Sequence, residues 1–106
     1  MSWNFFVAAA PASDFVARAQ TAGEAAMATY SASEEEKDAM REQIEAAIIQ
    51  AAGLLNVVQP DVDGWVSASL AGHANPGHRK REGYANDYVQ VAVYHQPAEV
   101  AARPGP

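Results

Sequence analysis

Hydrophobic and polar residues alternate along three segments of the chain, and this alternation predicts three β-strands. The first spans Trp3 to Ala9, the second Trp65 to Ala71, and the third Tyr88 to His95. A period of two places successive side chains on opposite faces of a sheet. In the last two segments one set is apolar and the other is aromatic or polar. We therefore expect a sheet with one core-facing side and one half-polar side.

Between the first two strands the apolar residues recur at steps of three and four, which predicts amphipathic helices. The first helix is expected from about Asp14 to Tyr30, after Pro11 ends the strand, with Ser13 as its N-cap. Its apolar face consists of Phe15, Ala19, Ala22, Ala26 and Tyr30. Gly23 costs up to about 1 kcal/mol relative to alanine inside a helix. Close packing of the helix explains a glycine there.

The second helix is expected from about Glu34 to Leu54. Ser33 and Glu36 match a capping box, in which each side chain bonds to the backbone amide of the other residue. A capped, solvated first turn accounts for the glutamates, so we do not interpret them as a metal site. The apolar stripe of this helix is Met40, Ile44, Ala47, Ile48, Ala51 and Leu55.

The order β-α-α-β-β predicts an α+β fold, with two antiparallel helices packed on a three-stranded antiparallel sheet. The last two strands are expected to pair as a hairpin with a long loop. The partner of the first strand stays open. Residues 1–96 would form a single domain. Residues 59–64, rich in Pro, Asp and Gly, would form a turn before the second strand. Residues 97–106, after the last strand, would form a tail that is flexible or ordered by a partner.

The half-polar side of the sheet would expose aromatic side chains in a monomer. Trp65, Tyr88 and Tyr94 share it with Ser67, Ser69 and Gln90. Exposed aromatic patches mark interfaces, so we expect a homodimer or higher oligomer with Trp65 and Tyr94 in the contact. The alternative is that the C-terminal tail folds back over this side.

Composition narrows the picture in three ways. The chain has 106 residues and no cysteine, which suits one modest domain without disulfides. Much of its apolar content is alanine, so the core should be thin, as in many small proteins that oligomerise. No segment resembles a signal peptide or a membrane span, so we expect no membrane partner.

Charge is unevenly distributed along this acidic chain. The net charge is −6; residues 1–63 hold ten acidic and three basic side chains, and residues 64–106 hold three acidic and four basic ones. Three of the basic residues are consecutive, at 79–81. General DNA binding is not expected, because it requires many phosphate contacts. One basic loop can still hold a small anion.

The loop Gly72–Asp87 is the candidate site, because hairpin loops of this length are functional or disordered. Its glycines give backbone freedom, and its turns expose amides that can cradle an anion. Arginine grips phosphate with two bonds, histidine donates near neutral pH, and tyrosine stacks on a base. The predicted ligand-binding residues are His73, Asn75, His78, Arg79, Arg81, Tyr84, Asn86 and Tyr88.

Each part of the loop also has a plainer interpretation. The basic residues 79–81 suit a solvated loop tip, and Tyr84 suits a packing anchor. His73 and His78, with Asp87, suggest a metal, but two loop histidines without a third nearby are weak grounds for one. No nucleophile–base or acid–base arrangement appears. We therefore predict no metal, no cofactor and no enzymatic activity.

Three segments, WNFFVAAAPASDFVARA, WVSASLAGHANPGH and GYANDYVQVAV, carry a resemblance. Across about residues 3–95 the chain resembles small, mostly uncharacterised proteins of tailed bacteriophages that infect actinobacteria. Those proteins have a short aromatic strand, two alanine-rich helices, strands of a VSVSG type and a polar hairpin. WVSASLAGH departs from that type at Ala68, Leu70 and Ala71. The resemblance implies a phage origin and supplies no function.

Two functions follow as expectations. The first is a non-enzymatic, oligomeric phage protein in the host cytoplasm that sequesters a small anionic, nucleotide-like ligand, such as a host immune signal, through the 72–88 loop. That expectation draws on an analogy with small phage proteins that bind such signals without cleaving them. The second is a virion-associated protein that docks to capsid or tail components through its sheet face and tail.

Overall fold

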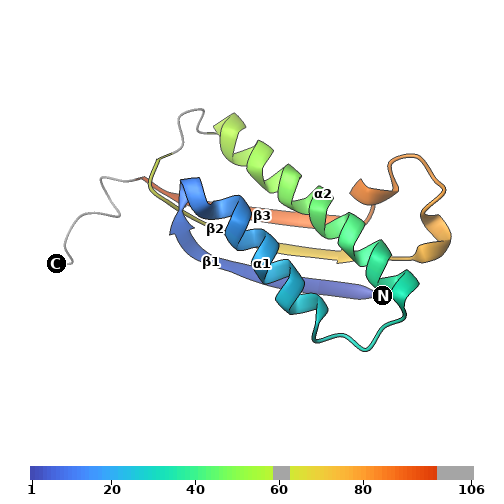
Figure 1. Ribbon diagram of the computed structural model, residues 1–106. Coiled ribbons are helices and arrows are strands. Elements are labelled where there is room, and N and C mark those ends of the chain that lie inside the picture. Colours follow the sequence, from blue (N-terminus) through green and yellow to red (C-terminus); the bar gives the residue numbers. More distant parts are fainter. Residues whose placement is uncertain (59–62, 98–106) are drawn as a thin grey trace.

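The computed structural model describes residues 1–58 and 63–97, and it confirms the α+β fold with the order β-α-α-β-β (Figure 1). The regular elements are β1 (Ser2–Pro11), α1 (Phe15–Met27), α2 (Glu34–Val58), β2 (Trp65–His73) and β3 (Val89–Gln96). Three short 3-10 turns join them, η1 (Ala12–Asp14), η2 (Pro76–His78) and η3 (Tyr84–Asn86). The last two lie within the long hairpin loop.

The three strands form one antiparallel sheet in the order β1-β2-β3. The N-terminal strand therefore pairs with β2, which the sequence had left open. Ser2 lies opposite His73, and Pro11 lies opposite Trp65, with a bulge between Val7 and Ala10. A bulge bends a strand and increases its twist. β3 pairs only with the other side of β2, so β1 and β3 are the edges of the sheet.

Both helices cover the same side of this sheet, and the core lies between the two layers (Figure 1). Val66, Ala68 and Leu70 of β2 are buried there, so the predicted assignment of the two sheet sides is confirmed. The predicted stripe of α2 is buried throughout, as are Phe15 and Ala19 of α1. Alanine is common among the core side chains, so this core is thin for its length.

The helix termini correct two predictions. α1 begins at Phe15, after a 3-10 turn that contains Ser13, and its N-cap is Asp14 without a side-chain cap bond, so Ser13 is not the cap. α1 also ends at Met27 rather than near Tyr30, because the amides of Thr29 and Tyr30 bond to carbonyls three residues back in a tightening turn. The Tyr30 hydroxyl then accepts the backbone N–H of Asn4.

Helix α2 begins as predicted and extends beyond its predicted end. The Ser33 amide donates to the Glu36 carboxylate and the Glu36 amide donates to the Ser33 hydroxyl, both at 3.1 Å, which confirms the capping box. Gly23 of α1 is buried against this helix. A Cβ there would lie 2.9 Å from Cγ2 of Ile44, so close helix packing does require the glycine.

Parts of two predicted segments fall outside the described residues. The turn at 59–64 is described only at its end, where Gly64 has a φ of 108°. The tail is described only at Pro97, so its suggested return over the sheet lies outside the described residues. Within the described residues, neither helix combines the length and the apolar composition that a bilayer crossing requires.

Candidate functional site

The side of the sheet away from the helices carries large side chains that no described element covers. Phe6 is 57% exposed, Trp65 44%, Tyr88 50% and Tyr94 56%. We call this side the open face and define it by the side chains of Asn4, Phe6, Trp65, Ser67, Ser69, Ala71, Gln90, Ala92 and Tyr94. The predicted interface residues Trp65 and Tyr94 therefore both lie on it.

The open face has no formal charge. All three strands, as the structure describes them, lack Asp, Glu, Lys and Arg. The charged side chains of the described chain lie instead on the helices and the connecting segments, in a molecule whose net charge is −6. Depletion of charge together with exposed aromatics is the composition that distinguishes the centre of a protein interface.

The centre of the open face is recessed because several of its side chains are small. A hollow of about 300 Å³ is bordered there by Asn4, Phe6, Ser69, Ala71, Gln90 and Ala92. Phe6, Ser69 and Ala92 are register partners across the sheet, so a large side chain on β1 lies in the same row as small ones on β2 and β3. The open face thus has both protruding rings and a recess.

The base of the hairpin loop is held by Gln43, which lies on the buried stripe of α2 and is 0% exposed. Its amide nitrogen donates to the carbonyls of His73 and Asp87, at 3.1 and 2.8 Å, where the two strands of the hairpin meet the loop. Its amide oxygen accepts from Nε1 of Trp3 at 2.9 Å. One side chain therefore joins β1, α2 and both ends of the loop. The sequence analysis missed it, although a glutamine within an apolar stripe was a visible signal.

Inside the loop, two predicted ligand residues make structural contacts. Tyr84 is buried, and its hydroxyl accepts the backbone N–H of Asn75 at 2.9 Å. Burial raises the pKa of Tyr84, and the hydrogen bond from Asn75 opposes that shift. The Asn75 side chain accepts a hydrogen bond from the backbone N–H of Gly77, and Asn75 is thereby the N-cap of η2. The loop is thus folded by its own contacts, with Tyr84 as the anchor.

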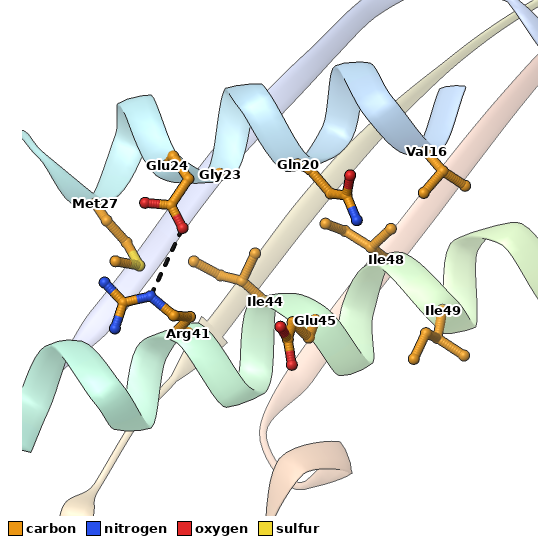
Figure 2. Close-up of a pocket in the computed structure, with 10 residues that line it drawn as sticks. All are labelled: Val16, Gln20, Gly23, Glu24, Met27, Arg41, Ile44, Glu45, Ile48 and Ile49. Atoms are coloured by element: carbon orange, nitrogen blue, oxygen red, sulfur yellow. Dashed lines mark ion pairs between the residues drawn. The ribbon is translucent and has the colours of Figure 1, made fainter. Parts of the chain in front are cut away.

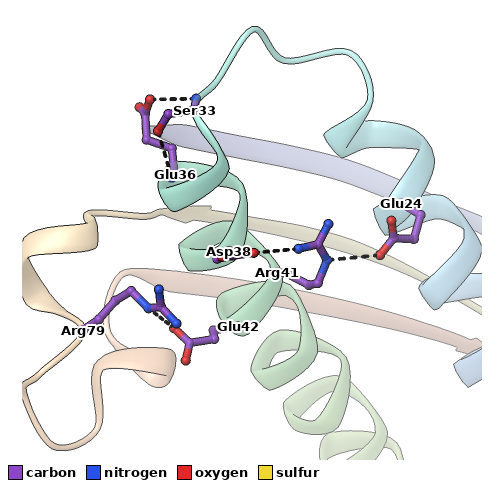
Figure 3. Close-up of polar contacts among 7 residues, drawn as sticks. All are labelled: Glu24, Ser33, Glu36, Asp38, Arg41, Glu42 and Arg79. Carbon is purple, nitrogen blue, oxygen red and sulfur yellow. Dashed lines mark hydrogen bonds and ion pairs between the residues drawn. The ribbon is translucent and has the colours of Figure 1, made fainter.

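Both predicted arginines have carboxylate partners. Arg79 Nε lies 2.7 Å from Glu42 on α2 (Figure 3), and a hydrogen bond to this carboxylate raises the pKa of Arg79. Arg81 pairs with Asp87 at the end of the loop. A ligand phosphate would have to displace these carboxylates. The structure thus binds the loop to α2 through Arg79 and leaves Lys80, between the arginines, exposed.

The remaining aromatic residues of the loop gather at the hairpin end of the open face. The ring of His78 stacks on Tyr88 with centroids 5.8 Å apart, and His73 meets Tyr88 edge-on at 6.4 Å. Tyr88 has a φ of 64°, a rare conformation for a bulky residue. Nδ1 of His78 is buried without a hydrogen-bond partner among the described residues. His73, His78 and Tyr88 thus form a cluster. Asn86 is exposed in η3, and its side chain makes no hydrogen bond with the described residues.

The described residues of the loop and the open face offer hydrogen-bonding and stacking groups. Across residues 1–58 and 63–97, no group of three or more His, Asp or Glu side chains is placed to hold a metal. Nδ1 of His73 lies 3.1 Å from the Ser2 hydroxyl, but both groups are exposed. A catalytic dyad requires a third group that orients the base and a donor set for the developing charge.

A second hollow, of about 460 Å³, lies between α1 and α2 on their outer side (Figure 2). Its floor is apolar, with Met27, Ile44 and Ile48 between the two helices. One end is crossed by an ion pair between Arg41 and Glu24, 3.6 Å apart. Exposed Ile49 continues the apolar strip. Its polar lining residues are Gln20, Glu24, Arg41 and Glu45, and the ion pair between Glu24 and Arg41 joins the two helices.

Comparisons of this chain with protein-family models, with curated proteins and with solved structures found no match. The resemblance to small tailed-bacteriophage proteins therefore stays a prediction from the sequence.

Proposed function

We propose that this chain is a non-enzymatic assembly protein that works as a homodimer joined through its open face. The observation that carries the proposal is the coincidence of exposed Phe6, Trp65 and Tyr94 with strands that contain no charged residue. Burial of exposed apolar surface favours association by about 25 cal/mol per Å² before the costs of binding.

The partner that suits this face is a second copy of the same chain. Two molecules of net charge −6 repel each other, and they can approach most closely where neither presents a charge. A nucleic acid or a strongly basic partner would instead be recognised by charged side chains, which the strands do not offer. Self-association through this face therefore fits its uncharged chemistry.

The test is sedimentation analysis of the wild-type chain and of two charge variants. Ser69→Asp places a carboxylate in the middle of the open face, and Gln50→Asp places the same charge on an exposed position of α2. We expect a wild-type dimer in the micromolar range, at least about tenfold weaker association for Ser69→Asp, and no change for Gln50→Asp. Circular dichroism checks that both variants fold.

A wild-type chain that stays monomeric at high micromolar concentration would contradict this proposal. It would favour the virion-associated alternative, in which the same face meets a capsid or tail protein, and mass spectrometry of purified particles would then look for the chain there.

A second function, binding of a small anionic, nucleotide-like ligand by the hairpin loop, is supported by a separate observation. Tyr88 is half exposed, is held at positive φ and is flanked by His73 and His78 beside the basic residues 79–81. Strained residues of this kind cluster at ligand sites. In this proposal the tyrosine stacks on a base, and a phosphate replaces the carboxylates that pair with Arg79 and Arg81.

Thermal shift measurements against cyclic dinucleotides and ADP-ribose derivatives test this second function. Glu42→Gln frees Arg79 from its partner and should increase the shift, whereas Tyr88→Ala should abolish it. Equal melting temperatures with and without every ligand, in the wild type and in Glu42→Gln alike, would overturn it.

A further inference from the structure

We propose that the free edge of β3 is a second self-association site, at which two copies pair their β3 strands antiparallel and join their sheets into one. This contact lies beside the open face rather than on it, and it does not depend on the proposed open-face dimer. An edge strand presents a row of unpaired backbone N–H and C=O groups, which pair with a strand of another chain unless something blocks them. The two edges of this sheet differ in that respect.

The edge formed by β1 is interrupted in several ways. The N–H of Asn4 donates to the Tyr30 hydroxyl at 3.1 Å rather than to a strand. A bulge follows between Val7 and Ala10, and the strand ends in Pro11, which has no N–H to offer. Bulges, prolines and side chains that cover an edge are devices by which proteins prevent strand addition. β1 therefore offers a second chain only a short, interrupted row of backbone groups.

Within residues 1–58 and 63–97, the edge formed by β3 has none of these obstacles. The strand contains neither proline nor a charged residue, and its pairing with β2 is regular from Val89 to Gln96. No side chain or loop in the described part of the chain bonds to its outer backbone groups. β3 is therefore the edge that is open to strand addition.

The alternation of bonds along an antiparallel pair identifies the free groups. The N–H of His73 donates to the carbonyl of Tyr88 at 3.2 Å, so the backbone of this pair points inward, between β2 and β3. Bonded pairs alternate with unbonded ones along the ladder. The N–H and C=O of Val89, Val91 and Val93 therefore point away from β2. Their side chains are half-buried at the rim of the core, so an added strand covers apolar surface as well.

β3 is complementary to itself in such a pairing. A two-fold axis at Ala92 places Val91 beside Val93 of the second copy on the helix side of the sheet. On the open side it places Gln90 beside Tyr94. β-branched and aromatic residues favour cross-strand pairs, and no like charges meet here although each chain has a net charge of −6. A second copy is thus a partner of matching length and chemistry.

The proline after the strand fixes the position of the axis. An axis at Val93 would set Pro97 opposite Val89, and proline has no N–H to complete the ladder. An axis at Val91 would shorten the overlap of the two strands. The axis at Ala92 lets the outer backbone groups of β3 pair along the whole strand.

The edge contact is expected to be weaker than the open-face contact. Each backbone hydrogen bond replaces bonds to water, and isolated two-stranded pairs are marginal, so we expect a dissociation constant of roughly 0.1–1 mM. The open face and the β3 edge are different parts of one molecule. Contacts of the two kinds can therefore alternate from copy to copy and extend an assembly beyond two chains.

Amide hydrogen exchange, followed by NMR, tests the edge in Ser69→Asp, the variant designed to weaken the open-face contact. The amides of Val91 and Val93 should exchange at least about twofold more slowly at roughly 2 mM than at about 0.05 mM, because pairing protects them. The amide of Phe6, on the edge strand β1, is the control and should exchange at the same rate at both concentrations. Unchanged rates at Val91 and Val93 overturn the edge contact and leave the open-face dimer, which sedimentation of the wild type tests, standing.

A disulfide test locates the axis. At the proposed axis Ala92 and its copy form a non-hydrogen-bonded pair, whose Cα atoms lie about 4.5 Å apart, within the range that a disulfide spans. Sheets stacked face to face lie about 10 Å apart, which is too far. Ala92→Cys, in a chain without other cysteines, should cross-link in a redox buffer at least about tenfold faster than Asn4→Cys, an exposed position at the other edge. Equal rates for the two variants would contradict pairing at β3.

Discussion

At the scale of single residues, Gln43 is the polar side chain on which the loop depends. Among the described residues it is fully buried, and each of its bonds reaches a different element, through Trp3, His73 and Asp87. A buried amide with all these partners is stable, but its removal leaves several buried polar groups unpaired. The contacts of Gln43 thus fix where the hairpin loop begins and ends.

Gln43→Leu should lower the free energy of unfolding by about 3 kcal/mol, because the Trp3 N–H and two carbonyls lose their partner while the side-chain volume is kept. Gln50→Leu, at an exposed position of the same helix, should change it by less than about 0.5 kcal/mol. Urea unfolding measures both. Similar values for the two variants would show that the Gln43 bonds do not hold the loop.

Two glycines in the helices should respond oppositely to alanine. Gly23→Ala should destabilise the protein by about 1 kcal/mol or more, because the new Cβ would lie 2.9 Å from Cγ2 of stiff, β-branched Ile44. Gly53→Ala should stabilise it by roughly 0.5–1 kcal/mol, since nothing lies within 4 Å of that Cβ and alanine favours a helix. Thermal unfolding of both variants gives the signs, and a stabilising Gly23→Ala would contradict the close packing of the helices.

At the scale of elements, the two ends of α2 differ in how they are fixed. Its start is set locally by the Ser33–Glu36 capping box (Figure 3). Its first half is also tied to the hairpin loop through Glu42 and Arg79. The loop therefore contacts α2 through Arg79 and lies beside the end of the open face through Tyr88. In isolation the residues between β2 and β3, 74–88, could not keep this shape, because long loops need such contacts to stay ordered.

The capping box makes part of the stability depend on pH. Hydrogen bonds from the backbone and side chain of Ser33 lower the pKa of Glu36 below its usual value. A carboxylate with a depressed folded-state pKa stabilises the protein above the unfolded pKa, and this contribution is lost as the pH falls through the folded pKa. Ser33→Ala should therefore raise the Glu36 pKa and flatten the fall of stability in acid. NMR titration of the Glu36 carboxyl measures the shift, and an unchanged Glu36 pKa in the variant would contradict it.

At the scale of the whole molecule, formal charge is distributed unevenly between the two layers. The helix layer and the loops carry the charged side chains of the described chain, and the sheet presents an uncharged face. A net charge far from zero favours solubility, whereas an uncharged face with exposed aromatic rings favours association. The molecule thus has two unlike layers, and the open face is the one through which the proposed dimer forms.

This uneven distribution of charge predicts how the proposed dimer responds to salt. Raising the ionic strength should leave the dimer constant unchanged or strengthen association slightly, because salt screens the repulsion between two copies of net charge −6 and no ion pair crosses the open face. Binding of an anion by the hairpin loop should weaken over the same range. Sedimentation and ligand titration at low and moderate salt compare the two, and a dimer that dissociates as salt rises would point to contacts through the charged helices or loops instead.

Much of this fold could be predicted from the sequence because its signals are local or periodic. The alternation in β2 and β3 assigned the two sides of the sheet, the stripe from Met40 to Leu55 identified the buried side of α2, and Ser33 and Glu36 marked its start. Each depends only on geometry that a chain imposes on residues a few positions apart. The predicted N-cap of α1 was wrong, because Ser13 lies within the 3-10 turn at Ala12–Asp14, which precedes the helix.

For the candidate site, too, the features that follow from local patterns were predictable and those that depend on long-range contacts were not. The sequence by itself determined which residues the loop contains, and it determined that Trp65 and Tyr94 share one side of the sheet. Only the tertiary structure decided that β1 pairs with β2, that Gln43 closes the loop, and that Arg79 and Arg81 already have carboxylate partners. These contacts join residues far apart in the chain, and they are selected by the packing of the whole molecule rather than by any short-range pattern.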